Sequence, residues 1–597
     1  MAYEYFYEGT PSSLEPYKDA IYTGANVPAG VLGAPTSVQT ANQITEVSNL
    51  LNTGMKTIEL STISPEVFEM IPKQHLKEIN RLSGITNADI TLHAPLIEPS
   101  GFTQQGWNEQ NRELAERQLK DTVLRAYEVS PEKPIPVTIH ASAIPGTETM
   151  PAESVKGLEE EQKKAYGNYV PTQMIAVNQE TGELIPLRRE EEYYPEEGKV
   201  IRTPEEKLEM LNHTHWINKI TNLAFYKKEA DEILIPAYAQ IAPKIMEGKI
   251  SEEEQKELAP ALNKYKKADL FLDNIISTFR TFYDEAYKAG DEKTREIFDH
   301  VAKIWQEKEK EMRKNPLKAP ALKSEMIDEI FGALDAFKKP ELREHAPQFY
   351  KPVEQFAIEK ASETFSNVAL EAYKKFGSKA PIISIENPPY GSALSTGEEL
   401  KKLIEETRQK FIEKAIKEGK SKSEAKKAAE QMIGATWDTS HISMMRRMGY
   451  KPEQLVEEAK KIAPFVKHVH LNDNFGYTHT DLPPGMGSVP IKEILAELEK
   501  KGYKGKHIFE GAQFFQHFKV SPHAMVLEAM GSPIYPALAQ PTWAQVYGTL
   551  GAYASGYGPF LPEQHFSIYG AGFAGLPTEL GGQVPGKQSR LSGTPMT

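Results

Sequence analysis

The chain has 597 residues, a formal charge of −13 at pH 7 and no cysteine. Its length exceeds that of one ordinary domain, its acidity argues against a broad nucleic-acid-coating surface, and the lack of cysteine excludes disulfides, thiolate metal sites and a cysteine nucleophile. We expect a cytoplasmic protein, because the N-terminus has no signal-peptide pattern and no run of about 18 apolar residues predicts a membrane helix.

Short apolar runs separated by helical patterns predict an α/β fold. In chain order the predicted strands are Val31–Thr36, Thr57–Leu60, Ile90–His93, Pro136–His140, Pro381–Glu386, Ala435–Asp438, Val466–Leu471 and His507–Glu510. Helical spacing covers residues 41–52, 65–82, 108–127, 353–376 and 397–427. Eight strands alternating with helices indicate a (β/α)8 TIM barrel. An open doubly wound sheet would show a glycine-rich fingerprint after the first strand, which this sequence lacks.

The alternation stops between the fourth and fifth strands. Residues 145–350 begin with a predicted hairpin that turns at Thr181-Gly182, and Thr203-Pro204 then begins long helices rich in lysine and glutamate. We therefore predict a mainly helical insertion, which divides the barrel into residues 1–144 and 351–520. Because it follows a strand end, we expect the insertion to cover the mouth of the barrel.

The last segment, residues 521–597, is rich in glycine, proline and aromatic residues and poor in charge. Its aromatic content argues against a fully solvated linker. We expect this tail to be an irregular arm, and it offers a surface for a protein partner.

Imidazole and carboxylate groups follow six consecutive predicted strands. Since the carboxyl ends of parallel barrel strands share one face, these groups should meet in one mouth. Buried charges are costly unless they are paired or bind metal, so the cluster predicts a divalent metal site. The candidate ligands are His93, His140, Glu386, Asp438, His441, His470, His479, Asp481 and Glu510.

Some neighbours of these residues have predicted supporting roles. Asn387, Asn472 and Asp473 are placed to orient the ligands. We expect His468 to lie on the strand face opposite His470 and either to support a metal ligand or to serve in packing.

The strand-end motifs HAP, IHAS, IEN, DTSH, HLND, PPGMG and FEG, in that order, resemble the endonuclease IV / xylose isomerase-like superfamily of TIM barrels, AP endonuclease family 2. The resemblance covers about residues 31–144 and 351–515. It extends neither to the insertion nor to the tail. Endonuclease IV implies a hydrolase with up to three zinc ions that cleaves DNA at abasic sites, a DNA repair activity.

This resemblance also implies which residues would bind each of the three zinc ions. His93 and His140 would hold one zinc, and Glu386 would bridge it to a second zinc. Asp438, His470 and Glu510 would complete that second site, and His441 with the pair after HLND would hold the third. The family reads Asp-x-His at that pair, whereas this chain reads His479-Thr480-Asp481, and Met486 replaces an acid of the following loop.

Two other functions stay open. The sugar isomerase and epimerase branch implies one Mn, Co or Mg ion held by Glu386, Asp438, His470 and Glu510, with Glu386 and Glu510 as the catalytic proton carriers. The candidate ligand residues that this one-metal reaction does not need favour a phosphodiester hydrolase acting on abasic DNA or a related phosphate ester. The third hypothesis is a non-catalytic assembly component that binds a partner through the tail.

Overall fold

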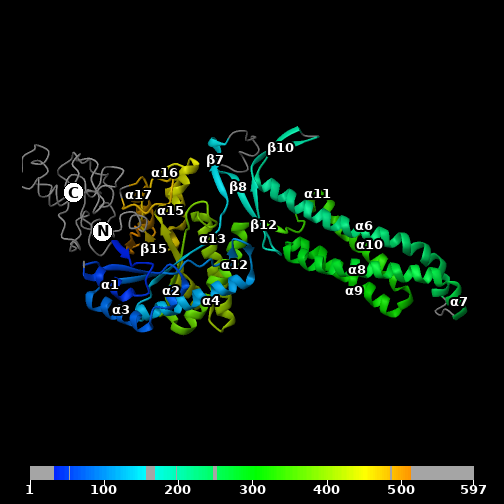
Figure 1. Cartoon of the computed structure of the whole chain (residues 1–597), viewed down its shortest axis with the longest axis horizontal. Coiled ribbons are helices and arrows are strands. Elements are labelled where there is room, and N and C mark those ends of the chain that lie inside the picture. Colours follow the sequence, from blue (N-terminus) through cyan, green and yellow to red (C-terminus); the bar gives the residue numbers. More distant parts are fainter. Residues whose placement is uncertain are drawn as a thin grey trace, which may run out of the picture.

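The computed structural model describes residues 32–52, 54–155, 169–195, 198–246, 252–343, 345–484, 487–511 and 523. A closed barrel of parallel strands lies in the left half of Figure 1. The barrel strands are β1 (Leu32–Pro35), β2 (Thr57–Ser61), β3 (Asp89–His93), β6 (Pro136–His140), β13 (Ile382–Glu386), β14 (Ile433–Asp438), β15 (Val466–His470) and β16 (His507–Ile508). The predicted TIM barrel is confirmed.

The register of the barrel brings the strand ends to one level. Ser61 pairs with His93, His140 pairs with Glu386, and Asp438 pairs with His470. Because every neighbouring pair of these strands is parallel, all the carboxyl ends open on one face of the barrel.

Helices surround the barrel. They are α1 (Gln43–Asn52), α2 (Pro65–Glu69), α3 (Lys73–Thr86), α4 (Glu109–Ala126), α12 (Val353–Phe376), α13 (Gly397–Lys417), α14 (Lys422–Met432), α15 (Thr439–Ser443), α16 (Pro452–Ile462) and α17 (Ile491–Lys500). Helix α12 has the predicted bounds, and its Phe356 and Phe365 are buried in the barrel's apolar core.

Two predicted helices are each divided in the structure. Between α2 and α3, Pro72 has an extended backbone and immediately precedes the first residue of α3. Between α13 and α14, Gly419 adopts a φ of 88°, a left-handed conformation that favours glycine, and the Ser421 hydroxyl then caps α14. None of the described helices is long and apolar enough to cross a membrane.

The segment between β6 and α12 has its own strands, helices and apolar core. Its elements are β7 (Glu148–Pro151), β8 (Tyr169–Asn178), β9 (Leu184–Arg188), β10 (Glu190–Tyr194), β11 (Gly198–Arg202), α6 (Pro204–Met246), α7 (Glu252–Glu257), α8 (Ala259–Ala289), α9 (Glu292–Lys314), α10 (Ala319–Leu334), α11 (Pro340–Arg343) and β12 (Tyr350–Pro352). A second apolar cluster, which includes Trp216, Phe282 and Phe298, joins the long helices.

Two local predictions in this segment are confirmed. Strands β8 and β9 form the antiparallel hairpin, and Gly182 at its turn has a φ of 73°. Helix α6 begins at Pro204 behind a capping box, in which Glu206 N donates to Thr203 Oγ1 and Thr203 N donates to Glu206 Oε2.

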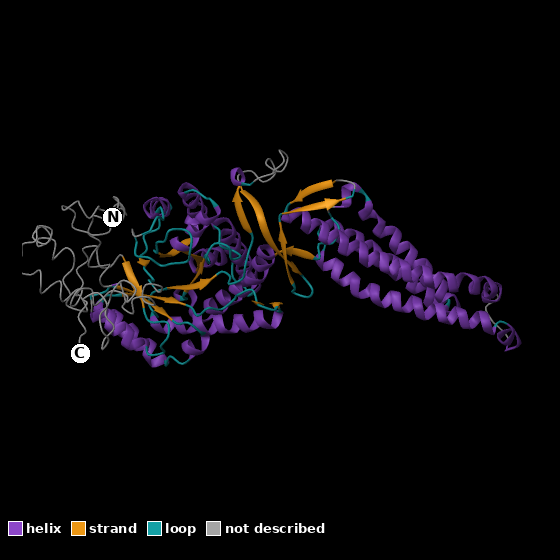
Figure 2. Ribbon diagram, turned by 45° about the horizontal axis from the view of Figure 1, so that its top comes forward, coloured by secondary structure: helices purple, strands orange, loops and turns teal. Residues whose placement is uncertain are grey.

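The long helices form an arm that points away from the barrel. Figures 1 and 2 show α6, α8, α9 and α10 side by side along the long axis of the molecule, beyond β7 and β8. In neither view do these helices lie over the barrel strands. The expectation that the insertion covers the barrel mouth is therefore wrong for its described helices. The lead-in before residue 32 and the tail 521–597, except His523, lie outside the described residues.

Polar contacts join the start of the insertion to the barrel. Thr149 N donates to the Tyr390 hydroxyl at 3.1 Å, and Arg447 Nη2 lies 3.3 Å from Glu148 Oε1. Three glutamates of the helical layer, Glu354, Glu399 and Glu458, interact electrostatically in this region. Burial and the neighbouring carboxylate of Glu354 raise the pKa of Glu399 to about 7.

We expect Glu399→Gln to stabilise the protein at pH 8 but not at pH 4. The raised pKa means that protonated Glu399 favours folding, a contribution that is full below the ordinary pKa of 4.5 and is lost as the pH rises through about 7. Glutamine keeps the capping hydrogen bond from Thr396 N and carries no charge. The free energy of unfolding, measured with urea, should rise by about 1–3 kcal/mol at pH 8.

The partly exposed neighbour Glu398 provides the matched control. Glu398→Gln should change the free energy of unfolding by similar small amounts at both pH values. A stabilisation by Glu399→Gln that does not depend on pH would show that the titration of Glu399 is not its cause.

Candidate metal centre

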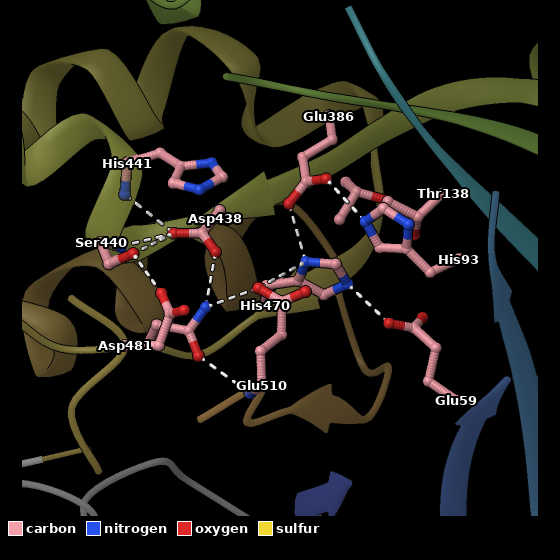
Figure 3. Close-up of polar contacts among 12 residues, drawn as sticks. Glu59, His93, Thr138, Glu386, Asp438, Ser440, His441, His470, Asp481 and Glu510 are labelled. Atoms are coloured by element: carbon pink, nitrogen blue, oxygen red, sulfur yellow. Dashed lines mark hydrogen bonds and ion pairs between the residues drawn. The ribbon is translucent and has the colours of Figure 1, made fainter. Parts of the chain in front are cut away.

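Glu386, the last residue of β13, reaches both His470 and His93 in the strand-end cluster (Figure 3). Its Oε1 lies 2.7 Å from His470 Nδ1, and its Oε2 lies 3.3 Å from both His93 Nε2 and His140 Nε2. Burial opposes the charged carboxylate, but His470 and His140 hold the pKa of Glu386 well below its ordinary value. The buried carboxylate is therefore ionised at neutral pH.

His93 and His140 close β3 and β6 beside Glu386. His93 donates Nδ1–H to the Ala94 carbonyl at 2.8 Å, which leaves Nε2 facing the carboxylate. Burial opposes protonation of His93, yet the adjacent carboxylate of Glu386 raises its pKa to about 9. For His140 burial dominates and lowers the pKa to about 4.

Asp438 and Glu510 are held in place by one amide. Asn472 Nδ2 donates to Asp438 Oδ2 at 2.7 Å and to Glu510 Oε2 at 2.9 Å, and Asn472 Oδ1 accepts from Glu510 N at 3.0 Å. The other oxygen of Asp438 caps α15 by accepting from the backbone N–H groups of Ser440 and His441. Glu510 Oε2 lies 3.5 Å from His470 Nδ1, so both carboxylates border the same space as Glu386.

His441, His479 and Asp481 extend the cluster beyond α15. His441 donates Nδ1–H to the Asn387 carbonyl at 2.7 Å, so its Nε2 faces outward and lies 2.9 Å from His479 Nε2. His479 Nε2 in turn lies 3.5 Å from Asp481 Oδ1. Burial raises the pKa of Asp481 to about 7. The reversed order His479-Thr480-Asp481 still brings His479 to His441 and Asp481 to His479.

All the predicted ligand residues come together in one continuous cluster. The imidazole ring centroids are 5.2 Å apart for His93 and His140, 6.3 Å for His140 and His441, and 4.7 Å for His441 and His479. Exposure increases outward, from 1% for the Glu386 side chain to 22% for His140 and 38% for His479. The cluster therefore extends from a buried floor to an accessible rim.

The supporting asparagine and aspartate residues contact the cluster or its loops. Asn387 Oδ1 accepts from Asp438 N at 2.8 Å. Asp473 accepts from the backbone N–H groups of Asn474, Gly487 and Val489, which fixes the loop after β15. Asn387 and Asn472 thus position predicted ligands, whereas Asp473 positions a loop.

The predicted strand face of His468 is wrong. His468 and His470 are two residues apart on β15, and residues with this spacing share a strand face. Both reach Glu59 inside the barrel: His468 Nε2 lies 3.1 Å from Glu59 Oε2, and His470 Nε2 lies 3.0 Å from Glu59 Oε1. Glu59 was not among the sequence-predicted site residues. A charged residue inside the second strand, between the apolar Ile58 and Leu60, was the available signal.

The donor set fits a divalent metal. Ligand atoms of Glu386, Asp438, His470 and Glu510 lie within 4.8 Å of one another, and so do those of His93, Glu386 and His470. Glu386 Oε2 is buried and makes no hydrogen bond within the described part of the chain. Backbone carbonyls fix His93 and His441 in the tautomer that presents Nε2 to the cluster, as in metal-binding histidines.

Comparison with known proteins places this cluster in a family context. No curated protein matches the chain. A solved structure titled "Crystal structure of D-tagatose 3-epimerase-like protein" is 13% identical, with 83% of this chain and 94% of that chain covered and a TM-score of 0.36. Residues 357–514 match the family model described as xylose isomerase-like TIM barrel, which confirms for this segment the superfamily that the strand-end motifs resemble.

Proposed function

We propose that the protein is a metal-dependent hydrolase that cleaves a phosphodiester, with abasic-site DNA as the first substrate to test. The chain of imidazole and carboxylate contacts that continues beyond Glu386, Asp438, His470 and Glu510 carries this proposal. A one-metal isomerase has no use for the additional groups His93, His140, His441, His479 and Asp481, whereas a multinuclear hydrolase uses all of them.

The residues divide into three groups around the shared carboxylate. His93, His140 and Glu386 would hold one ion, and Glu386, Asp438, His470 and Glu510 would hold a second. His441, His479 and Asp481 would hold a third near the rim. Bound divalent ions supply an activated water at neutral pH and neutralise the charge of the phosphoryl transition state.

The chain's own residues prepare this site. Asn472 keeps Asp438 and Glu510 together, and Asn387 holds both the Asp438 backbone and the His441 ring. These contacts fix the ligand atoms before metal or substrate binds, which reduces the reorganisation that the reaction requires.

A sugar isomerase or epimerase is the second candidate. The compact group of Glu386, Asp438, His470 and Glu510 favours it, because one ion held there would leave two glutamates beside a bound sugar. In that reaction Glu386 and Glu510 would carry protons between carbon atoms next to the carbonyl. Burial raises the pKa of Glu510, which suits a carboxyl that alternates between protonated and ionised forms.

Metal stoichiometry and a cleavage assay test the proposal together. We expect elemental analysis of chelator-free protein to find two or three zinc ions per chain, and the zinc-loaded protein to cleave a duplex that contains one abasic site. An undamaged duplex of the same sequence is the substrate control. One manganese, cobalt or magnesium ion per chain, with an uncut abasic duplex and exchange between ketose and aldose, would replace the hydrolase with the isomerase.

A further inference from the structure

Glu59 lies inside the barrel on the side of His470 away from Glu386 (Figure 3). It belongs to β2 and is completely buried. Its Oε1 lies 3.0 Å from His470 Nε2, and its Oε2 accepts from His468 Nε2 at 3.1 Å and from Thr91 Oγ1 at 2.9 Å. Neither the metal ligands of the proposed hydrolase nor those of the isomerase include Glu59.

A carboxylate in this position requires a physical reason. The interior layers of a TIM barrel are filled mainly by branched apolar side chains, and an unpaired buried charge is costly. Here two imidazoles and one hydroxyl contact Glu59 and stabilise its charge. Packing alone gives no reason for these polar groups, because apolar side chains of similar volume fill a protein interior at no such desolvation cost.

His470 connects Glu59 to the cluster through its two ring nitrogens. Nδ1 lies 2.7 Å from Glu386 Oε1 and 3.5 Å from Glu510 Oε2. Nε2 and Glu59 Oε1 lie 3.0 Å apart; both atoms are buried, and neither is hydrogen-bonded to another group in the described part of the chain. A neutral imidazole carries its proton on one nitrogen and binds metal through the other. An acceptor at Nε2 therefore determines that Nδ1 is the nitrogen available to a cation.

We propose that Glu59 is a positioning residue that accepts the Nε2–H of His470 and thereby presents Nδ1 to a divalent cation held with Glu386, Asp438 and Glu510. His468 and Thr91 hold the second oxygen of Glu59 and fix its orientation. This inference rests on the metal site of the proposed function, and it adds the residue that sets the affinity of that site.

The experiment compares binding of Mn²⁺ to the full chain and its variants by electron paramagnetic resonance of the free ion. Glu59→Gln removes the charge and keeps the size, and we expect the affinity to fall about 10- to 100-fold with the number of bound ions unchanged. Thr91→Val removes one hydrogen bond to Glu59 and should weaken binding by a smaller factor. Glu458→Gln, at a buried glutamate on α16 that binds Gly397 N and Lys461, is the matched control and should bind as the unaltered protein does.

A spectroscopic signal separates positioning from a merely structural role. In Zn²⁺-loaded protein labelled with ¹⁵N-histidine, the Nε2–H of His470 should give a slowly exchanging downfield resonance, assigned by its loss in His470→Gln. We expect this resonance to shift and to exchange faster in Glu59→Gln, and to stay unchanged in Glu458→Gln.

The outcomes distinguish this inference from the proposed function. Unchanged affinity and an unchanged resonance in Glu59→Gln, with metal bound to the unaltered protein, would overturn the role of Glu59 alone. Loss of one whole ion from Glu59→Gln would also overturn it, because Glu59, His468 and His470 would then be direct ligands of their own ion. An unaltered protein that binds no divalent ion would overturn both proposals.

Discussion

Glu386→Gln is expected to remove bound metal and to lower phosphodiester cleavage by about 10³-fold or more, roughly 4 kcal/mol of transition-state stabilisation. The carboxylate is the one group that contacts His93, His140 and His470 at once. An amide in its place brings no charge and can offer only one acceptor oxygen to two sites. Metal content by elemental analysis and turnover of the abasic duplex would be measured on the same preparations.

The same substitution should destabilise the metal-free protein in a pH-dependent way. Glu386 raises the pKa of His93 to about 9, above the ordinary value of 6.5, so this pair stabilises the fold fully below about pH 6.5 and loses its effect as the pH rises through 9. The lowered pKa of Glu386 keeps its own contribution present above 4.5. Unpairing a buried charge costs about 3–5 kcal/mol, so the loss should be of this order near pH 6.

Thermal unfolding of chelated protein between pH 5 and pH 10 tests this second effect. The difference in Tm between unaltered protein and Glu386→Gln should be greatest near pH 6 and should decrease toward pH 10. Glu458→Gln is the control for loss of a buried carboxylate away from the histidines. A constant difference across the pH range, or full metal occupancy in Glu386→Gln, would contradict the central role of this residue.

The barrel was predictable because its strands carry a local signal that repeats. Each run is apolar, short and followed by polar residues, and the spacing between runs leaves room for a helix, so parallel order and closure follow. Local sequence patterns also predicted the hairpin at Thr181-Gly182 and the start of α6 at Pro204. The direction of the helical arm depends on packing between distant segments, such as α6 against α8 and α10, and no pattern within one helix encodes it.

The strand-end residues were predictable because closure of a parallel barrel places all strand ends on one face. The strand-end pattern does not include Glu59, because Glu59 is the third residue of β2 and does not close the strand. Its partner His468 lies 409 positions away, a pairing that only the closed barrel creates. The misplaced His468 shows that face assignment fails when the two-residue period of a strand is not applied strictly.

The groups at the rim discriminate between the two candidate reactions. His479 and Asp481 lie in the loop after β15 and meet His441, outside the set Glu386, Asp438, His470 and Glu510. Burial raises the pKa of Asp481 to about 7, so the metal-free carboxyl is held close to its titration point, and a cation would keep it ionised. A hydrolase that uses three ions needs this group, whereas a one-metal isomerase does not.

We therefore expect Asp481→Asn to release one zinc ion and to lower cleavage of the abasic duplex by about 10²- to 10³-fold, comparable to the loss of one charge-stabilising group in other active sites. The ions held through Glu386 should stay bound, because Asp481 contacts none of the groups in that set except through Ser440. Thr480→Ala, in the same loop between His479 and Asp481, controls for disturbance of the backbone. If Asp481→Asn keeps every bound ion, and if the unaltered protein and the variant interconvert ketose and aldose at the same rate, then Asp481 is structural and the reaction depends on Glu386, Asp438, His470 and Glu510.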